Sequence, residues 1–403
     1  MRNRRHRLAA ALAGLGAAVM IGLAGAPAQA ASTTEESAPA AAGWLADQLV
    51  DGTFVETEFG PSAGLTIDAV LAFAATGVAG DQAGNAMTWL ATPEVLPGYV
   101  GDGEVEIYAG AHAKLALAAQ VQGLDPTSFG GVDLPARLLA LQDEDGRFRD
   151  QSEFGDFSNA FTQSFAVLAL VRTPTGAPAE AVDFLLAEQC PGGGFPEQFG
   201  QESCSSDVDA TAMVVQALLA AGADPAAALD WLAGQQQPGG GFTGAGLGAN
   251  ANSTGLAGQA LRAAGRDAPA DAAVSFLQSL QVGCDGPEEQ RGAVALDDTG
   301  FDPTANVELA TAQAILGMTG VAMGELDGTG AQSEAPSLRC ETTPTPTPTG
   351  SAAPAPGGKG GELPVTGSPV LLLAGGGAAL AGAGGLAIWG TRLRRRDSGP
   401  AAG

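Results

Sequence analysis

The stretch AVDFLLAEQCPGGGF, residues 181–195, joins an apolar helical pattern to a glycine-rich turn that ends in one aromatic residue. It recurs as ALDWLAGQQQPGGGF at residues 228–242, and ARLLALQDEDGRF at residues 136–148 has the same form. The closing Phe residues stand 47 positions apart in both steps. Self-similarity at a fixed period is typical of folds that stack one supersecondary unit many times.

The repeat extends, with weaker similarity, over residues 43–320. A large apolar residue marks the first half of each unit, and the steps between these residues are 45, 49, 46, 47 and 45 positions. The six residues are Trp44, Trp89, Leu138, Phe184, Trp231 and Phe276. Steps this regular predict six structural repeats.

Each unit holds two apolar segments of different character. The first has one apolar stripe among polar residues, as expected of a helix with one face in water. The second, such as DATAMVVQALLAAG at residues 209–222, is apolar nearly all round and indicates a buried helix. We predict an all-α fold of six helical hairpins that close into an α6/α6 toroid, with disordered linkers and a C-terminal hydrophobic helix. In the loops between the two helices, Phe148, Phe195 and Phe242 are predicted to fix the loops onto the end of the barrel.

The turns that begin at Gln142, Gln189 and Gln236 resemble the Q-x-x-x-G-x-F/W repeat of the prenyltransferase and squalene-cyclase superfamily. The segment 209–222 is similar to the inner-helix signature of that superfamily. The resemblance covers about 280 residues and implies the α6/α6 toroid. It does not imply one activity, because members include squalene-hopene cyclases, protein prenyltransferase β-subunits, cobalamin carriers and complement thioester domains.

Asp207 and Asp209 are the catalytic candidates that the resemblance brings. Class II terpene cyclases protonate an alkene with the middle acid of an Asp-x-Asp-Asp motif. The string DVDA at residues 207–210 supplies the first two acids and lacks the last, whose carboxyl tunes the proton donor. Aromatic residues, which stabilise carbocations in such enzymes, make up only 5% of the chain. A cyclase-like enzyme with a degenerate acid motif is therefore an alternative hypothesis.

The sequence does not supply the residues that two other chemistries of this superfamily require. Prenyltransferases hold zinc with Asp, Cys and His, but the only histidine after the first thirty residues is His112, and no cysteine lies within 70 positions of it. A complement-type thioester requires Cys and Gln three positions apart, whereas Cys284 and Gln290 are six apart. A surface Ca²⁺ at Asp143 and Asp145 stays open, although their loop does not match an EF-hand. We predict no metal and no cofactor, and interpret His112 as a partly buried structural residue.

The inner helices of such a ring run the same way, so their N-termini and the six long loops meet at one end, here called the mouth. Aligning the helices on their Gln residues superposes Asp209, Asn252 and Asn306, with Asn159 within two residues of that position. Because Asp and Asn favour the N-cap, we predict that Asp209 belongs to a row of caps and that Asp207 stands outside it. Helix N-termini carry positive partial charge, so the mouth is also the expected ligand site. Its candidate residues are Asn159, Asp207, Asp209, Asn252 and Asn306.

The two ends of the chain carry signals for export and anchoring. Residues 1–30 combine a basic head, an apolar stretch and a small-x-small triplet, which is typical of a secretory signal peptide. LPVTG, followed by an apolar run and an Arg cluster, resembles a Gram-positive cell-wall sorting signal. Its residues are Leu363, Pro364, Val365, Thr366 and Gly367. The resemblance implies that a sortase joins Thr366 to peptidoglycan, and a lasting transmembrane anchor is the alternative.

These signals and the repeat divide the chain into seven expected parts. They are a signal peptide (1–30), a linker (31–42), the toroid (43–320), a Pro/Thr/Gly-rich wall spacer (321–362), the sorting motif (363–367), a hydrophobic segment (368–390) and a basic cytoplasmic tail (391–403). The precursor is expected to be only transiently associated with the membrane.

The chain has four cysteines, Cys190, Cys204, Cys284 and Cys340. In an exported protein disulfides are the default state of cysteines. Of the three pairings that four cysteines allow, we favour Cys190–Cys204, which closes a short loop. Cys284–Cys340 would then tie the start of the spacer to the globular part.

The mature chain is strongly acidic. Residues 31–366 carry 43 acidic and 10 basic side chains, a net charge of about −33. This charge argues against nucleic acid and other polyanions as partners and favours a cationic or neutral ligand. Our main hypothesis is a monomeric, wall-anchored surface protein whose toroid binds a small or extended ligand. The alternatives are the cyclase-like enzyme and a purely structural or adhesive display.

Overall fold

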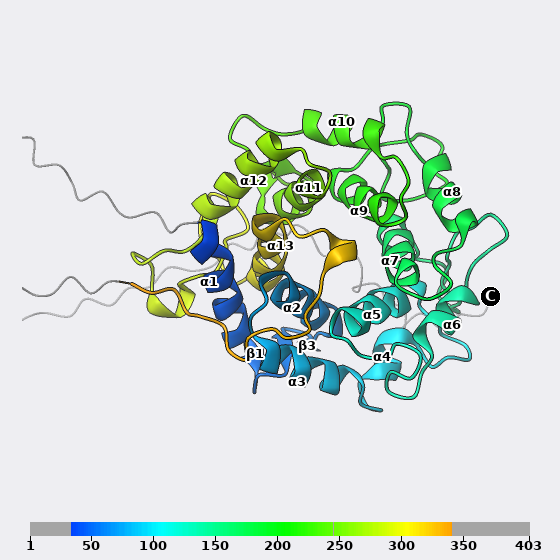
Figure 1. The fold of residues 1–403 in the computed structure, drawn as a ribbon, viewed down its shortest axis with the longest axis horizontal. Coiled ribbons are helices and arrows are strands. Elements are labelled where there is room, and N and C mark those ends of the chain that lie inside the picture. The colour runs from blue at the N-terminus through cyan, green and yellow to red at the C-terminus, as the bar shows by residue number, and fades with distance from the viewer. Residues whose placement is uncertain (1–33, 245, 341–403) are drawn as a thin grey trace, which may run out of the picture. The chain divides into compact units, whose positions relative to one another are not determined.

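The computed structural model describes residues 34–244 and 246–340 (Figure 1). The predicted signal peptide, sorting motif, hydrophobic segment and basic tail lie outside these residues. Among the described residues, no helix is both long enough and apolar enough to cross a membrane.

Helices alternate between an inner and an outer layer along the chain (Figure 1). The inner helices are α2 (Ala63–Thr76), α5 (Ala109–Val121), α7 (Ala160–Val171), α9 (Val208–Ala220), α11 (Ala251–Ala263) and α13 (Val307–Thr319). The outer helices are α1 (Thr34–Asp47), α3 (Gly80–Leu90), α4 (Leu96–Val100), α6 (Leu134–Leu139), α8 (Ala179–Ala187), α10 (Ala226–Gly234) and α12 (Asp267–Leu280). Two short 3-10 helices complete the set, η1 (Glu288–Gln290) and η2 (Met323–Glu325).

The fold is helix-rich, as predicted, but it is not purely helical. Two small antiparallel sheets lie in the long loops, with strand orders β1-β2-β3 and β4-β5. The strands are β1 (Leu49–Val50), β2 (Phe54–Thr57), β3 (Gly60–Pro61), β4 (Phe242–Thr243) and β5 (Ala249–Asn250). Gly and Asn in these loops supply the turns that let the chain pair with itself.

The inner helices follow one another around a circle. Each packs against the next, and α13 packs against α2 (Figure 1). Small residues permit the close approach: a Cβ on Gly255 of α11 would lie 2.1 Å from the carbonyl oxygen of Gln313 in α13. The two backbones therefore touch, which only glycine allows.

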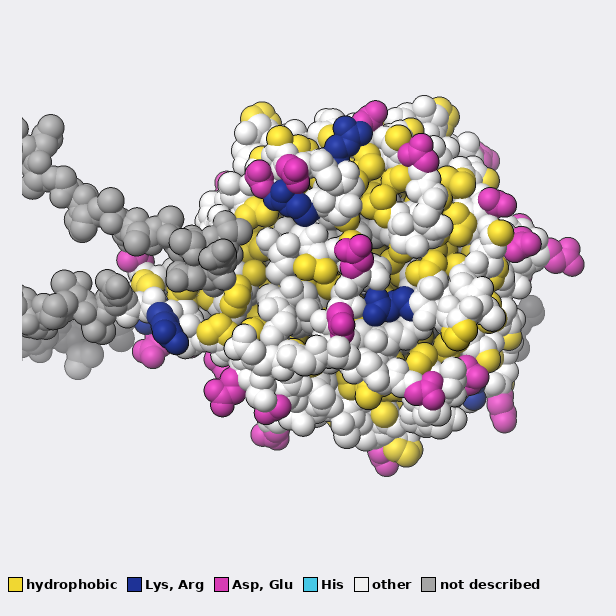
Figure 2. Space-filling view, in the orientation of Figure 1, with side chains coloured by type: hydrophobic (Ala, Val, Ile, Leu, Met, Phe, Trp, Pro, Cys, Tyr) yellow, Lys and Arg dark blue, Asp and Glu magenta, His cyan; other side chains and the backbone are white. Residues whose placement is uncertain are grey.

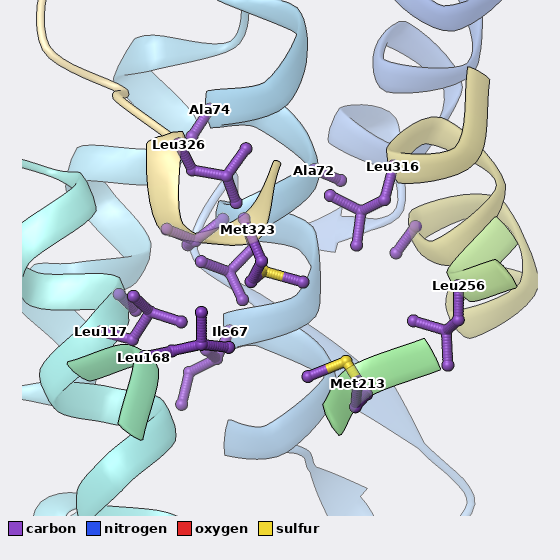
Figure 3. Packing of buried hydrophobic residues seen from close by; sticks show 14 of the residues in the cluster. Ile67, Ala72, Ala74, Leu117, Leu168, Met213, Leu256, Leu316, Met323 and Leu326 are labelled. Atoms are coloured by element: carbon purple, nitrogen blue, oxygen red, sulfur yellow. The ribbon is translucent and has the colours of Figure 1, made fainter. Parts of the chain in front are cut away.

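The axis of the ring is closed by residues 321–328, here called the axial plug. Met323 and Leu326 are 2% and 0% exposed, and they lie among side chains of the inner helices, including Leu168 and Met213 (Figure 3). In the space-filling view of this face, atoms fill the centre of the ring (Figure 2). The interior is thus a packed core along this part of the axis.

Polar contacts hold the axial plug in place. Arg172, the C-cap residue of α7, donates from Nη1 to the Gly324 carbonyl at 2.8 Å and from Nη2 to the Leu326 carbonyl at 3.0 Å. The backbone N–H of Met323 donates to Gln216 Oε1 at 3.1 Å. These contacts involve the C-terminal halves of the inner helices, so the axial plug lies at the end of the ring opposite the mouth.

The structure differs from the expected boundaries at both ends of the toroid. Residues 34–42, expected as a linker, belong to helix α1, which contains Pro39. Residues 321–340, expected as the start of the spacer, belong to the same compact unit as the ring. Both disulfides form as predicted, Cys190–Cys204 and Cys284–Cys340, and the second joins the end of this segment to the loop before α13.

Replacing Met323 by Ala tests whether the axial plug is part of the core. The change leaves a cavity among inner-helix side chains, so we expect the free energy of unfolding to fall by about 2–4 kcal/mol. Leu186→Ala, at a side chain that is 41% exposed, is the matched control and should cost less than about 1 kcal/mol. Urea unfolding measures both, and equal losses would contradict a packed plug.

Candidate functional site

The mouth is formed by the first turns of the inner helices and by the loops that lead into them. These loops are residues 48–62, 101–108, 140–159, 188–207, 235–250 and 281–306. Neighbouring loops are hydrogen-bonded to one another, for example through Ile107 N to the Gln151 carbonyl at 2.8 Å. The mouth is therefore one connected surface.

A repeated hydrogen bond attaches five of the six loops to their inner helices. The N–H of Phe195 donates to Thr211 Oγ1 at 2.8 Å, and the N–H of Phe242 donates to Thr254 Oγ1 at 2.8 Å. The other bonds of this kind are Val55 to Thr66, Phe148 to Gln163 and Val294 to Thr311. We call them loop latches. Phe148, Phe195 and Phe242 are fully buried, which confirms that they fix the loops onto the ring.

His112 occupies the corresponding turn of α5, and it is fully rather than partly buried. Its Nδ1 lies 2.9 Å from the Tyr108 carbonyl, and burial lowers the pKa of its imidazole. Within the described residues its Nε2 has no hydrogen-bond partner. A neutral, buried imidazole supports the structural interpretation of His112.

The N-caps differ from the predicted row. Asn159 caps α7, since its Oδ1 accepts from the N–H groups of Phe161 and Thr162 at 3.0 and 3.2 Å. Asp207 caps α9 by accepting from Ala210 N at 2.8 Å, so the prediction that Asp207 stands outside the row is wrong. The prediction that Asp209 is a cap is also wrong, because it lies in the first turn of the helix.

The same two-residue displacement occurs in α11. Asn250 is the N-cap and accepts from Ser253 N at 2.9 Å, whereas the predicted cap Asn252 lies inside the first turn. Asn306 does hold the N-cap position of α13, in a left-handed conformation with φ 53°, but its side chain makes no capping hydrogen bond. Of the four predicted caps, only Asn159 caps through its side chain.

Asp209 has an unusual environment for a carboxylate. Burial, opposed by the nearby Ser253 hydroxyl and assisted by the charges of Asp207 and Glu197, raises the pKa of Asp209 to about 7. Neither Asp209 Oδ1 nor Ser253 Oγ has a hydrogen bond of normal geometry to another described residue. The carboxyl is therefore half protonated near neutral pH and can act either as a hydrogen-bond donor or as an anion.

Gly244, in the loop between β4 and β5, covers Asp209 and Ser253. A Cβ at position 244 would lie 2.4 Å from Ser253 Oγ and 2.8 and 3.1 Å from the two carboxyl oxygens of Asp209. The two side chains thus lie together beneath this backbone. Asn252, next to Ser253, also has a buried Oδ1 without a described partner.

A second polar pair was missed in the sequence. Lys114 Nζ lies 2.7 Å from Asp68 Oδ1, donates to the Gly64 carbonyl at 3.1 Å and stands 5.8 Å from the centre of the Phe165 ring. Asp68, Lys114 and Phe165 are each the sixth residue of their inner helix. The sixth residue of α9 is Met213, which points into the ring in Figure 3. Aligning the helices by this position would have revealed the pair.

The acidic turn considered for Ca²⁺ is paired with arginine. Arg149 forms ion pairs with Asp143, Asp145 and Asp156. Within the described residues no group of three or more His, Cys, Asp or Glu could hold a metal ion. Two surface depressions, one lined by Met87 and Gln122 among others and one by Pro135 and Arg172 among others, include none of the mouth candidates.

Comparison with known proteins identifies the fold but not the activity. No family model matches the sequence, and no curated protein matches it. Among solved structures, a type II terpene cyclase from Scytonema is 15% identical, with a TM-score of 0.52, 72% of this chain covered and 98% of that chain. An α-amylase from Clostridium perfringens is 10% identical, with a TM-score of 0.53, 70% of this chain covered and 97% of that one.

A glycosidase gives a similar result, at 16% identity, a TM-score of 0.51, 73% of this chain and 97% of that chain. Likeness at these identities concerns the fold alone. The chain has a toroid-type fold, which terpene cyclases and glycosidases share. Because these neighbours act on unrelated substrates, function has to be argued from the residues of this chain.

The raised pKa of Asp209 predicts how stability depends on pH. A carboxyl with a pKa near 3.9 in the unfolded chain and about 7 in the folded chain binds its proton more tightly when folded. Stability from this group is fully present below about pH 4 and is lost as the pH rises through 7. Asp209→Asn removes this loss. Between pH 4 and 8 the free energy of unfolding of the variant should therefore fall less than that of the wild type, and the difference between the two falls should be at most about 4 kcal/mol.

Urea unfolding of both proteins across this pH range measures the difference, and carboxyl ¹³C NMR of Asp209 gives the pKa directly. Other titrating groups are common to both proteins and cancel in the comparison. Parallel pH profiles would contradict the raised pKa.

The capping assignment is tested at Asp207. Asp207→Ala removes the acceptor of the Ala210 N–H and should cost about 1 kcal/mol. Asp207→Asn keeps an acceptor of the same size, and its stability should stay within about 0.5 kcal/mol of the wild type. Thermal or urea unfolding at pH 5, where Asp209 is protonated in both variants, isolates the cap. Equal losses in the two variants would argue against capping.

Proposed function

We propose that this chain is an exported surface protein that a sortase joins to peptidoglycan through Thr366. It displays a six-hairpin α6/α6 toroid of the prenyltransferase and squalene-cyclase type on a Pro/Thr-rich spacer. The mouth of the toroid binds a small or extended ligand. The protein acts as a monomer and does not bind nucleic acid, which its charge of about −33 would repel.

The order of signals along the chain supports the location. A signal-peptide pattern precedes the folded unit, and LPVTG, an apolar run and an Arg cluster follow it. Both disulfides within the described residues are of the kind that persists in oxidising compartments.

The observation that carries binding at the mouth is the packed axis. Met323 and Leu326 fill one end of the ring, so a ligand has access from the other end. Five of the eight large apolar side chains that are exposed in the described residues lie on the mouth loops. They are Phe59, Val105, Phe154, Phe157 and Leu247. Exposed apolar side chains that gather on one surface are typical of binding sites.

The cyclase-like alternative has one observation in its favour. Asp209 occupies the position of the middle acid of the Asp-x-Asp-Asp motif, and its raised pKa suits a proton donor. Against it, Ala210 replaces the last acid, and Met213, one turn further along α9, belongs to the packed core inside the ring, where a substrate would need space (Figure 3). The same packing is compatible with purely structural or adhesive display. A search for a bound ligand distinguishes such display from ligand binding at the mouth.

Anchoring is tested by Thr366→Ala in the host. The wild-type protein should be released from the cell wall by muramidase, whereas the variant should stay in the membrane fraction or the medium because its acyl-transfer residue is absent. Ser368→Ala, two positions beyond the motif's Thr, is the control and should behave as the wild type. Wall attachment of the Thr366 variant would overturn the sortase proposal.

Ligand capture is tested by native mass spectrometry of the protein released from its host's wall. The expected result is a mass in excess of the polypeptide and its wall fragment, which is lost when Phe157→Ser and Phe154→Ser remove the apolar contacts at the mouth. A bare polypeptide, with no thermal shift from isoprenoids or wall fragments, would favour structural display.

A further inference from the structure

Two neighbouring inner helices present unpartnered polar atoms at the mouth. These atoms are Asp209 Oδ1 on α9 and Asn252 Oδ1 and Ser253 Oγ on α11, all buried and without a hydrogen bond of normal geometry to another described residue, although the Ser253 hydroxyl lies close enough to act on the Asp209 carboxyl. Ser253 is only 1% exposed. A buried polar group without a partner costs roughly 1–3 kcal/mol. Three such atoms on the first turns of adjacent helices are free to accept hydrogen bonds from a bound ligand.

The chemistry of the cluster specifies a hydrogen-bond donor. The carboxylate and the amide oxygen only accept hydrogen bonds, and the hydroxyl can accept them. Ca²⁺ is a poor fit, because it requires six to eight oxygen ligands and the cluster has a single carboxylate. A primary ammonium group carries three N–H donors and one positive charge, which matches one carboxylate and two further acceptors.

The surrounding charge also favours a cation. Asp207 and Glu197 are the charged groups that act on Asp209, and both are acidic. The N-terminus of α9 is already occupied by the Asp207 cap, so its partial positive charge does not replace a missing cation.

Elsewhere in the ring an inner-helix carboxylate is paired with a cation of the chain itself. Between α2 and α5, the ammonium of Lys114 lies 2.7 Å from Asp68 and donates to the Gly64 carbonyl at 3.1 Å. Between α9 and α11, Asp209 and Ser253 offer a carboxylate and an acceptor without an ammonium. Asp209 and Asn252 are each partly exposed, so the cluster lies close to the surface of the mouth.

We propose that Asp209, Asn252 and Ser253 bind a primary ammonium group carried by the ligand of the mouth, such as a lysine side chain or a diamine. The inference rests on the proposed binding function and names the chemistry of its ligand. The ammonium donates to the carboxylate of Asp209 and to Ser253 Oγ, with Asn252 Oδ1 as the third acceptor. Binding requires that Asp209 lose its proton, so affinity rises with pH.

The test uses Nα-acetyl-lysine amide as the probe and the full chain as the protein. Nα-acetyl-norleucine amide has nearly the same shape without the charge, and the Nε-trimethyl derivative keeps the charge without N–H donors. Ligand-observed NMR should show the lysine probe binding at least about tenfold more tightly than either analogue at pH 8. Its affinity should fall about tenfold between pH 8 and pH 6, as Asp209 becomes protonated.

Three variants locate the site. Asp209→Asn should weaken the lysine probe at least about tenfold and abolish the pH dependence, and Ser253→Ala should weaken it several-fold. Asp183→Asn, which removes one exposed acidic charge on the outer helix α8, is the matched control and should change affinity at most about threefold. Gly244→Ala, whose new Cβ would lie 2.4 Å from Ser253 Oγ, should block the probe without removing a polar group.

Equal binding of the lysine and norleucine probes would overturn the inference, as would equal effects of Asp183→Asn and Asp209→Asn. Binding of putrescine in place of the lysine probe would support the same site with a free diamine as its ligand. A retained host molecule without a primary amine would overturn the ammonium site and leave binding at the mouth intact. Absence of both a retained molecule and probe binding would overturn both proposals.

Discussion

The architecture of the mouth depends on one interaction, the loop latch between a buried loop residue and its inner helix. A loop that enters the core brings backbone N–H groups with it, and a buried N–H needs a hydrogen-bond partner. Thr211 supplies that partner for Phe195, as Thr254 does for Phe242. The aromatic side chain is buried and its backbone is satisfied by the same contact. Each latch thereby holds a loop beside the N-terminus of its inner helix.

Glycine turns in the loops connect each unit to the outer helix of the next unit. Gly193 adopts φ 100°, and a Cβ there would lie 2.8 Å from the Ala227 carbonyl of the next outer helix. Gly292 makes the same approach to the Ala40 carbonyl of α1, at 2.5 Å, and Trp44 Nε1 donates to the Glu289 carbonyl at 3.0 Å. The last unit thus meets the first by the contact that joins consecutive units. The contact that each repeat makes with the next therefore also closes the ring.

The features that sequence reasoning recovered are local and periodic. Repeat spacing placed the buried Phe residues, and short separations in the chain pointed to the Cys190–Cys204 bond. The axial plug was missed because residues 321–328 have no periodicity and are buried only through distant contacts such as Arg172 to Gly324. The N-caps of α9 and α11 were predicted two residues too late, because each of these helices begins with two possible capping residues two positions apart. Only the backbone conformation shows which of the two lies outside the helix.

That displacement by two residues gives Asp207 and Asp209 opposite chemical roles. Asp207 accepts the hydrogen bond of the free Ala210 N–H and caps α9. Asp209, two residues further on in the first turn, is buried instead and holds its proton up to about pH 7. Asp68 shows that the ring can neutralise an inner-helix carboxylate with its own lysine. Between α9 and α11 no described side chain of the chain does so, and a charge left without a partner at a mouth lined by exposed apolar groups is best explained by a cation that comes from outside.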